Sequence, residues 1–398
     1  MTECSLEAPL FGILSKWHNR SGEGGADGSV LWGAVDWEKI AITASEQASP
    51  AEGTKPSSEP GPPVVPMIEI EGLVKRFGPF TAVDKISFTV ARGEVLGFLG
   101  PNGAGKSTTM KMVTGFLAPT AGRIRVCGHE VGADTLAAQR MIGYLPEGAP
   151  AYTDMTPLQF LRFIAEVRGL KGSAAEAAIA RSVDRTEIGG VMEQPIETLS
   201  KGFRRRVGLA QAILHDPPVL IMDEPTDGLD PNQKFAVRRL IAEMAPTKAI
   251  IISTHILEEV DAICSRALII DRGRIVADGT PAALTARSRY HNAVTLTLDA
   301  VHTDEARAAL SVLEGVASVE ETGRGGDMSF TLFAISSGET DTSLVDRVGN
   351  LAREKSWNVR TLYSEPGRLD EVFRSLTRTD TEAQATAGQA GPGGEQAA

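Results

Sequence analysis

Residues 100–107 constrain the fold of this chain more than any other segment. They read Gly-Pro-Asn-Gly-Ala-Gly-Lys-Ser and match Gly-x-x-x-x-Gly-Lys-Ser/Thr at every fixed position. The apolar run 95–99 precedes them and a helix-compatible stretch, 108–116, follows. This order of strand, glycine-rich turn and helix predicts a phosphate-binding loop in a fold of class α/β.

The composition of the loop indicates how it would hold a triphosphate. Its glycines allow a tight turn that aims several backbone N–H groups at one point beside a helix N-terminus. We expect the amine of Lys106 to contact the β- and γ-phosphates and the hydroxyl of Ser107 to bind Mg²⁺. The residues predicted to contact nucleotide in this segment are Gly100, Pro101, Asn102, Gly103, Ala104, Gly105, Lys106, Ser107 and Thr108.

A carboxylate pair provides the second half of the predicted site. The apolar run 219–222 is long enough for a buried strand and ends in Asp223 and Glu224. Functional groups of α/β nucleotide sites lie at the carboxyl ends of such strands. We expect Asp223 to hold Mg²⁺, directly or through water, and Glu224 to orient or deprotonate the attacking water.

Composition excludes several other classes of protein. The chain has 398 residues, room for two or three domains, with 42% hydrophobic and 23% charged residues. No segment approaches the ~18–20 apolar residues that a membrane helix needs. The net charge of −11 argues against nucleic acid as a partner. We interpret the basic triplet 204–206 as a subunit- or phosphate-facing surface, and the three scattered cysteines suit a reducing cytoplasm.

Further motifs follow the loop in a fixed order. Leu199-Ser200-Lys201-Gly202-Phe203 leads into a basic helix, Asp227-Gly228-Leu229-Asp230-Pro231 follows the carboxylate pair, and His255 follows the apolar run 249–252. Together these motifs resemble the ATPase subunit of ATP-binding cassette (ABC) transporters over about residues 67–285. The resemblance makes 199–203 the signature, 223–224 the Walker B motif with its catalytic glutamate, 228–231 the D-loop and His255 the switch histidine.

The resemblance implies roles for further residues and for partners. Ser200 and Gly202 would contact the γ-phosphate, Asp230 would belong to the nucleotide site, and the ring of Phe77 would stack on adenine. Lys106, Glu224 and His255 would form the catalytic set. ATP would bind between two subunits of a homodimer or heterodimer, and the dimer would drive an integral membrane permease. The chain would be cytoplasmic and held peripherally at the inner face of the cell membrane through that permease.

Two departures from the family pattern affect the site. The signature has Lys201 where glycine is usual and Phe203 where glutamine is usual. Glu147 replaces the usual Q-loop glutamine, and its carboxylate is predicted to bind Mg²⁺, which prefers oxygen ligands. Both departures resemble export-type cassettes associated with ABC-2 permeases, including gliding-motility and nitrous-oxide-reductase maturation ATPases.

The pattern predicts four consecutive regions. Residues 1–66 are expected to be a disordered extension with a linker, because 50–66 contains six prolines. Residues 67–288 form the cassette, with an antiparallel β part and a helical part from Thr156 onward. Residues 289–378 show a βαββαβ succession, which predicts a ferredoxin-like α+β module. Residues 379–398 are a polar tail, also expected to be disordered.

Two alternatives to a transport ATPase stay open at this point: a soluble, non-transport ABC ATPase of translation or DNA maintenance, and a catalytically inactive binding module. A soluble, non-transport ABC ATPase of translation would carry two phosphate-binding loops, whereas this chain has one. A chromosome-type ATPase would separate Lys106 and Asp223 by a long coiled coil, whereas they are 117 positions apart (223 − 106). A catalytically inactive binding module would not need Lys106, Asp223, Glu224 and His255 together.

Overall fold

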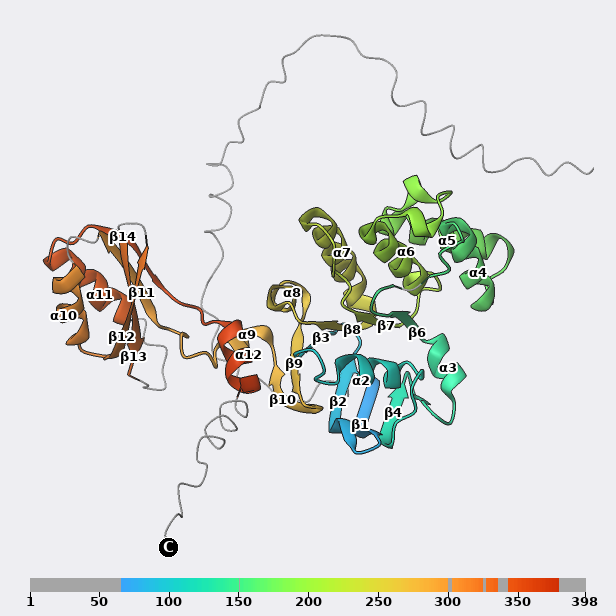
Figure 1. The fold of residues 1–398 in the computed structure, drawn as a ribbon, viewed down its shortest axis with the longest axis horizontal. Helices are drawn as coiled ribbons and strands as arrows, with labels where there is room; N and C mark the ends of the chain where they lie inside the picture. The colour runs from blue at the N-terminus through green and yellow to red at the C-terminus, as the bar shows by residue number, and fades with distance from the viewer. Residues whose placement is uncertain (1–65, 150, 300–302, 325–326, 336–342, 379–398) are drawn as a thin grey trace, which may run out of the picture. The chain divides into compact units, whose positions relative to one another are not determined.

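The computed structural model describes residues 66–149, 151–299, 303–324, 327–335 and 343–378 (Figure 1). The expected disorder of 1–66 and of 379–398 falls outside the described residues, except for Pro66. Pro66 opens the first strand, one residue earlier than the cassette start expected from the sequence.

A six-stranded sheet with the order β10-β9-β3-β8-β7-β6 forms the centre of the cassette. All its neighbouring strands are parallel except β10, which runs antiparallel to β9. Every residue of β3, β7 and β8 is buried, as expected for parallel strands covered on both faces. The carboxyl ends of β3, β8, β7 and β6 therefore meet along one edge of the sheet. The strands are β3 (Val95–Leu99), β6 (Ile142–Leu145), β7 (Val219–Asp223), β8 (Ala249–Thr254), β9 (Arg266–Asp271) and β10 (Arg274–Gly279).

The predicted antiparallel part is a separate sheet with the order β2-β1-β4-β5. It shares one hydrophobic core with the central sheet and with helix α2. The rings of Phe88 and Phe98, one from each sheet, lie 5.6 Å apart. Full burial of a side chain such as Phe98 contributes about 1.5–3 kcal/mol. The elements are β1 (Pro66–Phe77), β2 (Phe80–Ala91), α2 (Lys106–Val113), β4 (Ala121–Val126) and β5 (His129–Glu130).

The region expected to be helical from Thr156 onward packs around its own apolar cluster. Its first helix begins with a capping box in which Thr156 and Gln159 exchange hydrogen bonds, as the Thr156-Pro157 start signal indicates. Val167, the last residue of this helix, is 66% exposed. The elements are α4 (Pro157–Val167), α5 (Gly172–Thr186), η2 (Gly189–Val191), η3 (Ile196–Thr198) and α6 (Lys201–Ile213).

The remaining elements of the cassette connect these layers. Helix α7 follows β7, and the short helix α8 follows β8, so each begins close to the carboxyl edge of the sheet. Their bounds, with those of the other connecting helices, are α3 (Thr135–Arg140), α7 (Pro231–Met244), η4 (Ala245–Thr247), α8 (Leu257–Ile263) and α9 (Pro281–Thr285).

The C-terminal module has the βαββαβ succession that the sequence predicts, on an antiparallel sheet of order β12-β13-β11-β14. Helix α11 ends at Glu354, shortly before Ser356, which adopts a left-handed conformation with φ 53°. The elements are β11 (Val294–Asp299), α10 (Thr303–Ser311), β12 (Val316–Arg324), β13 (Asp327–Ala334), α11 (Ser343–Glu354) and β14 (Val359–Ser364).

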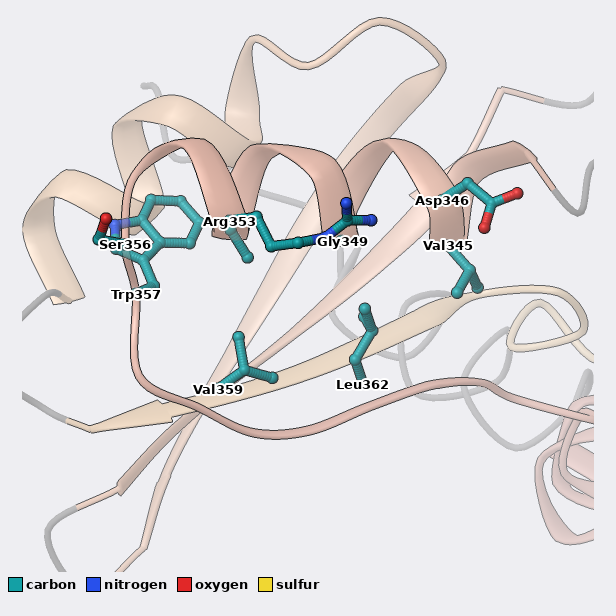
Figure 2. A pocket seen from close by; sticks show the side chains of 9 residues that line it. Val345, Asp346, Gly349, Arg353, Ser356, Trp357, Val359 and Leu362 are labelled. Carbon is teal, nitrogen blue, oxygen red and sulfur yellow. The ribbon is translucent and has the colours of Figure 1, made fainter.

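A groove of about 570 Å³ runs between α11 and β14 (Figure 2). Gly349 of the helix and Leu362 of the strand form its middle, and Trp357 closes one end. Charged side chains, Asp346 and Arg353, lie along its rim. The groove thus has an apolar floor that opens to solvent.

The last helix, α12 (Leu369–Arg378), packs on α9 of the cassette. Its Leu369 and Phe373 join the apolar cluster that contains Leu257 of α8. Glu371 of α12 accepts a hydrogen bond from the backbone N–H of Arg289, at 3.2 Å. None of the helices within the described ranges is long and apolar enough to cross a membrane.

Candidate functional site

The phosphate-binding loop turns between the end of β3 and the start of α2. Gly105 has φ 107°, and a Cβ there would lie 2.5 Å from the carbonyl oxygen of Ala82, so only glycine fits. A Cβ at Gly100 would lie equally close, 2.5 Å, to the carbonyl oxygen of Ile270. Helix α2 starts at Lys106, two residues earlier than predicted, and ends at Val113 before Gly115, which has φ 73°. The loop is therefore fixed by its glycines and opens directly onto a helix N-terminus.

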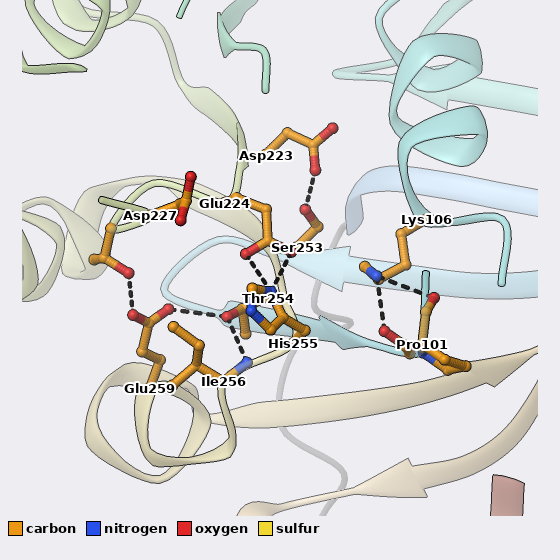
Figure 3. Close-up of polar contacts among 12 residues, drawn as sticks. Pro101, Lys106, Asp223, Glu224, Asp227, Ser253, Thr254, His255, Ile256 and Glu259 are labelled. Atoms are coloured by element: carbon orange, nitrogen blue, oxygen red, sulfur yellow. Dashed lines mark hydrogen bonds and ion pairs between the residues drawn. The ribbon is translucent and has the colours of Figure 1, made fainter. Parts of the chain in front are cut away.

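Lys106 is buried against its own loop. Its Nζ donates hydrogen bonds to the carbonyl oxygens of Gly100, at 2.7 Å, and Pro101, at 3.3 Å (Figure 3). Burial lowers the pKa of this amine. Three nearby carboxylates oppose that shift: Glu224, Asp223 and Glu147. The amine thus lies within electrostatic reach of the predicted metal ligands and of the predicted base.

Asp223 ends β7 and is buried. The hydroxyl of Ser253, on the neighbouring strand β8, donates to its Oδ1 (Figure 3). Its Oδ2 is buried and accepts no hydrogen bond from any described residue. Leaving such an atom without a partner costs about 1–3 kcal/mol, and a carboxylate oxygen is the type of ligand that Mg²⁺ prefers. The binding of Mg²⁺ by Asp223 stays a prediction.

The other predicted metal ligands lie at the same edge of the sheet. Ser107 is half-buried in the first turn of α2, and Glu147 is exposed two residues after β6. The described residues contain no group of three or more His, Cys, Asp or Glu side chains arranged to hold a metal ion. Mg²⁺ is usually bound through one or two carboxylates together with substrate phosphates and water.

Glu224 and His255 contact each other directly. Nδ1 of His255 lies 2.9 Å from both carboxylate oxygens of Glu224 (Figure 3). Because a carboxylate only accepts, the Nδ1–H of His255 donates the hydrogen bond. Burial raises the pKa of Glu224, and the hydrogen bond from His255 opposes that rise. Glu224 also has φ 52°, a strained conformation for a residue with a side chain. Strain and a perturbed carboxylate at one position are typical of a functional residue.

The signature residues occupy the start of α6. Ser200 caps this helix by accepting a hydrogen bond from the N–H of Phe203, at 3.3 Å. A Cβ on Gly202 would lie 2.4 Å from Oε1 of Gln233, the flexible end of a side chain on α7. The unusual Lys201 forms an ion pair with Asp227 at 2.8 Å. Both side chains are largely exposed, so this pair contributes little stability.

The structure shows the surroundings of two other residues that are predicted to contact the nucleotide. Asp230 caps α7 in a capping box with Gln233, whose N–H donates to it at 2.9 Å. Phe77, at the end of β1, is 49% exposed, and Nζ of Lys75 lies 5.1 Å from its ring centroid. Asp230 therefore has a structural role that the sequence motif did not reveal. The contacts of both residues with nucleotide stay predictions.

The structure separates the predicted residues into two groups. Lys106, Asp223 and Glu224 gather at the carboxyl edge of the central sheet, together with His255 and Glu147. Within the described part of the chain, no hydrogen bond or ion pair links Ser200 or Gly202 to the phosphate-binding loop. Among the described residues, Ser200 and Gly202 therefore make no direct bond to the loop, although Arg205 of the same helix bonds to the carbonyl oxygen of Asp223.

Arg205 is a site residue that sequence reasoning missed. The basic triplet 204–206 was interpreted as a surface, but the side chain of Arg205 is buried. Its Nη2 donates to the carbonyl oxygen of Asp223 at 2.6 Å, and Nε donates to that of Pro225 at 3.3 Å. Nη1 reaches the carbonyl oxygen of Pro146 at 3.4 Å. Helical spacing from Gly202 places residue 205 on the buried face, and this was the signal that could have identified it.

Comparisons with known proteins show the family of this chain. A family model described as "ABC transporter" matches residues 83–227. Nod factor export ATP-binding protein I of Ralstonia nicotianae is 36% identical over 225 residues, which cover 56% of this chain and 70% of that protein. Linearmycin resistance ATP-binding protein LnrL of Bacillus subtilis is 31% identical over 313 residues, 78% of this chain and 98% of that protein.

Solved structures give the same answer for the cassette. The ATP-binding subunit of an ABC transporter has a TM-score of 0.52 and 29% identity, covering 56% of this chain and 92% of that one. A dimeric cassette bound to ADP and Pi, MJ0796, has a TM-score of 0.51 at 19% identity, which shows the fold alone. The chain belongs to the ABC transporter family as an ATP-binding subunit with ATPase activity.

Proposed function

We propose that two copies of this chain, or one copy and a related chain, close around ATP and drive a separate membrane permease that exports its substrate. One observation carries the two-subunit part of the proposal. Lys106, Asp223 and Glu224 gather at one edge of the sheet, whereas the side chain of Ser200 is exposed and bonds, among the described residues, only to the N–H of Phe203 in its own helix. A second signature would complete the site.

Each residue has a role that follows from its position. The N–H groups of the loop and the amine of Lys106 bind the phosphates, with the amine exchanging the carbonyls of Gly100 and Pro101 for phosphate oxygens. Glu224 orients the attacking water and accepts its proton. His255 holds Glu224 in place before ATP arrives and then contacts the γ-phosphate.

Mg²⁺, when bound, would neutralise the charge that develops on the phosphates. Ser107, Asp223 and Glu147 would hold it, with Oδ2 of Asp223 as the oxygen that lacks another partner. Asn102, Gly103, Ala104 and Thr108 complete the loop that surrounds the phosphates, and Phe77 supplies the exposed ring for adenine.

The relatives support export as the direction of transport. Their names refer to Nod factor export and to linearmycin resistance. The Leu145-Pro146-Glu147 loop and the Leu199–Gly202 signature point to the ABC-2 subgroup. In this proposal the chain is cytoplasmic and reaches the inner face of the membrane through its permease. The permease makes the contacts with the transported molecule.

A cross-linking experiment tests the two-subunit site. One tagged copy carries Asn102→Cys, a second copy with another tag carries Ser200→Cys, and both carry Glu224→Gln to prevent turnover. Both positions are exposed in the single chain. We expect a short thiol cross-linker to join the two copies only when ATP and Mg²⁺ are present. A matched control replaces Ser200→Cys by Glu176→Cys, an exposed position on α5, and should give no ATP-dependent product.

The outcome separates the alternatives. Equal cross-linking with and without ATP, or equal yields from the Glu176→Cys control, would contradict the shared site. A second experiment tests the permease: the full chain is co-expressed with a multi-span protein, if one is encoded beside it. Membrane recovery of the chain should rise with that protein. Unchanged recovery would favour an ATPase that works without a permease.

A further inference from the structure

A buried carboxylate, Glu259, lies behind the catalytic residues. It belongs to the short helix α8 and is only 1% exposed. The hydroxyl of Thr226 donates to Oε1 of this carboxylate, and the hydroxyl of Thr254 donates to Oε2 at 2.9 Å (Figure 3). Each carboxylate oxygen is therefore bound by a different segment of the chain.

The two threonines lie next to the proposed catalytic residues. Thr254 immediately precedes His255, and its hydroxyl also accepts the N–H of Ile256 at 3.0 Å. Thr226 follows Glu224 by two positions and begins the loop 226–230. The N–H of Leu229 returns to the carbonyl oxygen of Thr226 at 3.2 Å. Glu259 thus connects the segment that carries His255 to the loop that follows Glu224.

The physical cost of this arrangement argues for a specific role. Burying a carboxylate is expensive unless hydrogen bonds satisfy it, and an apolar side chain would fill the same space more cheaply. Hydrogen bonds to an ionised acceptor are about twice as strong as neutral ones, so the carboxylate links its two partners firmly. The hydroxyl of Ser253 also donates to Asp223, which links β8 directly to β7.

We propose that Glu259 is a positioning residue that couples the switch histidine to the loop 226–230. When His255 leaves Glu224 for the γ-phosphate, Thr254 moves with it, and the carboxylate transmits that movement to Thr226. The loop 226–230 then takes the position needed for hydrolysis. This inference rests on the roles proposed above for Glu224 and His255.

Shape-conserving substitutions test the coupling. Thr226→Val and Thr254→Val each remove one hydroxyl from the carboxylate while retaining side-chain volume. We expect each to lower kcat about 10- to 100-fold, the scale for a misplaced catalytic group, with KM for ATP changed less than about twofold. The double variant should be no slower than the slower single variant, because either change already breaks the same link. Thr226→Ser and Thr254→Ser keep the hydroxyl, so their kcat should be close to that of the wild type.

A matched control distinguishes coupling from general stability. Thr186 is a buried threonine whose hydroxyl donates to the carbonyl oxygen of Ser182 at 2.7 Å in α5, outside the site. Thr186→Val should lower the thermal midpoint by a similar amount and leave kcat unchanged. The inference is wrong if the effects of Thr226→Val and Thr254→Val on kcat multiply in the double variant, or if serine fails to restore turnover. Its failure would leave the role of Glu224 intact, because that role is tested by Glu224→Gln alone.

Discussion

Replacing Arg205 by methionine tests whether the signature helix fixes the catalytic edge of the sheet. The guanidinium donates one short bond, 2.6 Å, to the carbonyl oxygen of Asp223 and two longer bonds, 3.3 and 3.4 Å, to those of Pro225 and Pro146. A hydrogen bond to a charged group contributes about 1.5–3 kcal/mol, and we assign about 0.5 kcal/mol to each of the longer ones.

The free energy that these hydrogen bonds contribute is reduced by the cost of burying the charge of Arg205. Burial lowers the pKa of Arg205, which shows that the protein environment disfavours the charged form. Methionine also recovers part of the apolar packing of the arginine stem. We therefore expect Arg205→Met to lower the free energy of unfolding by about 2 kcal/mol. We also expect kcat to fall by more than the loss of folded protein explains, because the backbone around Asp223 and Glu224 loses the hydrogen bonds from Arg205.

Urea unfolding monitored by fluorescence, together with steady-state ATPase measurements, would check both expectations. Arg206→Met is the matched control on the same helix. Its Nη1 binds Glu187 at 3.1 Å, away from the site, so its loss should cost less than about 1 kcal/mol and leave turnover intact. Arg205→Met with wild-type stability and turnover would refute the role of Arg205.

Three other substitutions have defined outcomes. Lys106→Ala should weaken ATP binding about tenfold or more, since a charge-assisted hydrogen bond contributes about 1.5–3 kcal/mol. Isothermal titration would measure the change, and unchanged affinity would contradict the role of Lys106. Ser200→Asp keeps the cap of α6 but places a carboxylate near the γ-phosphate of a second copy, so ATP should still bind the single chain while hydrolysis stops; equal loss of both would contradict a shared site. Burial, assisted by the charge of Arg168, lowers the pKa of His215 to about 4 from 6.5. The unfolded chain therefore binds a proton at His215 below about pH 6.5, where the folded protein keeps the imidazole neutral, so the free energy of unfolding is highest above about pH 6.5. It falls by about 2 kcal/mol, after allowance for partial exposure, as the pH falls toward 4. His215→Gln should make the free energy of unfolding less dependent on pH between about pH 7 and 4.5, as measured by urea unfolding.

The sequence predicted the parts of this fold that depend on local pattern. The strands 95–99 and 219–222 end within one residue of β3 and β7, because apolar runs next to glycine or charged residues define buried strands closely. The βαββαβ module followed from alternation and turn residues alone. The parallel order of the central sheet could not be read from spacing and entered only through the resemblance to a family.

The contacts that support the site were harder to predict. Arg205, Thr226 and Glu259 carry no motif of their own, since each bonds to backbone, carboxylate or hydroxyl groups of distant segments. The pairing of Lys201 with Asp227 likewise depends on how α6 approaches the loop after β7. Such long-range side-chain bonds depend on tertiary placement, which helical or strand periodicity does not specify.

Turnover and ATP-dependent dimerisation of Glu224→Gln together test the central claim most directly. This substitution keeps the shape of the side chain and removes the carboxylate that accepts the proton of the attacking water. We expect kcat to fall about 10²- to 10⁴-fold, while gel filtration with ATP and Mg²⁺ shows a dimer that is absent without ATP. Wild-type turnover, or a single chain at all ATP concentrations, would contradict the assignment of Glu224 as the catalytic base of a site shared by two subunits.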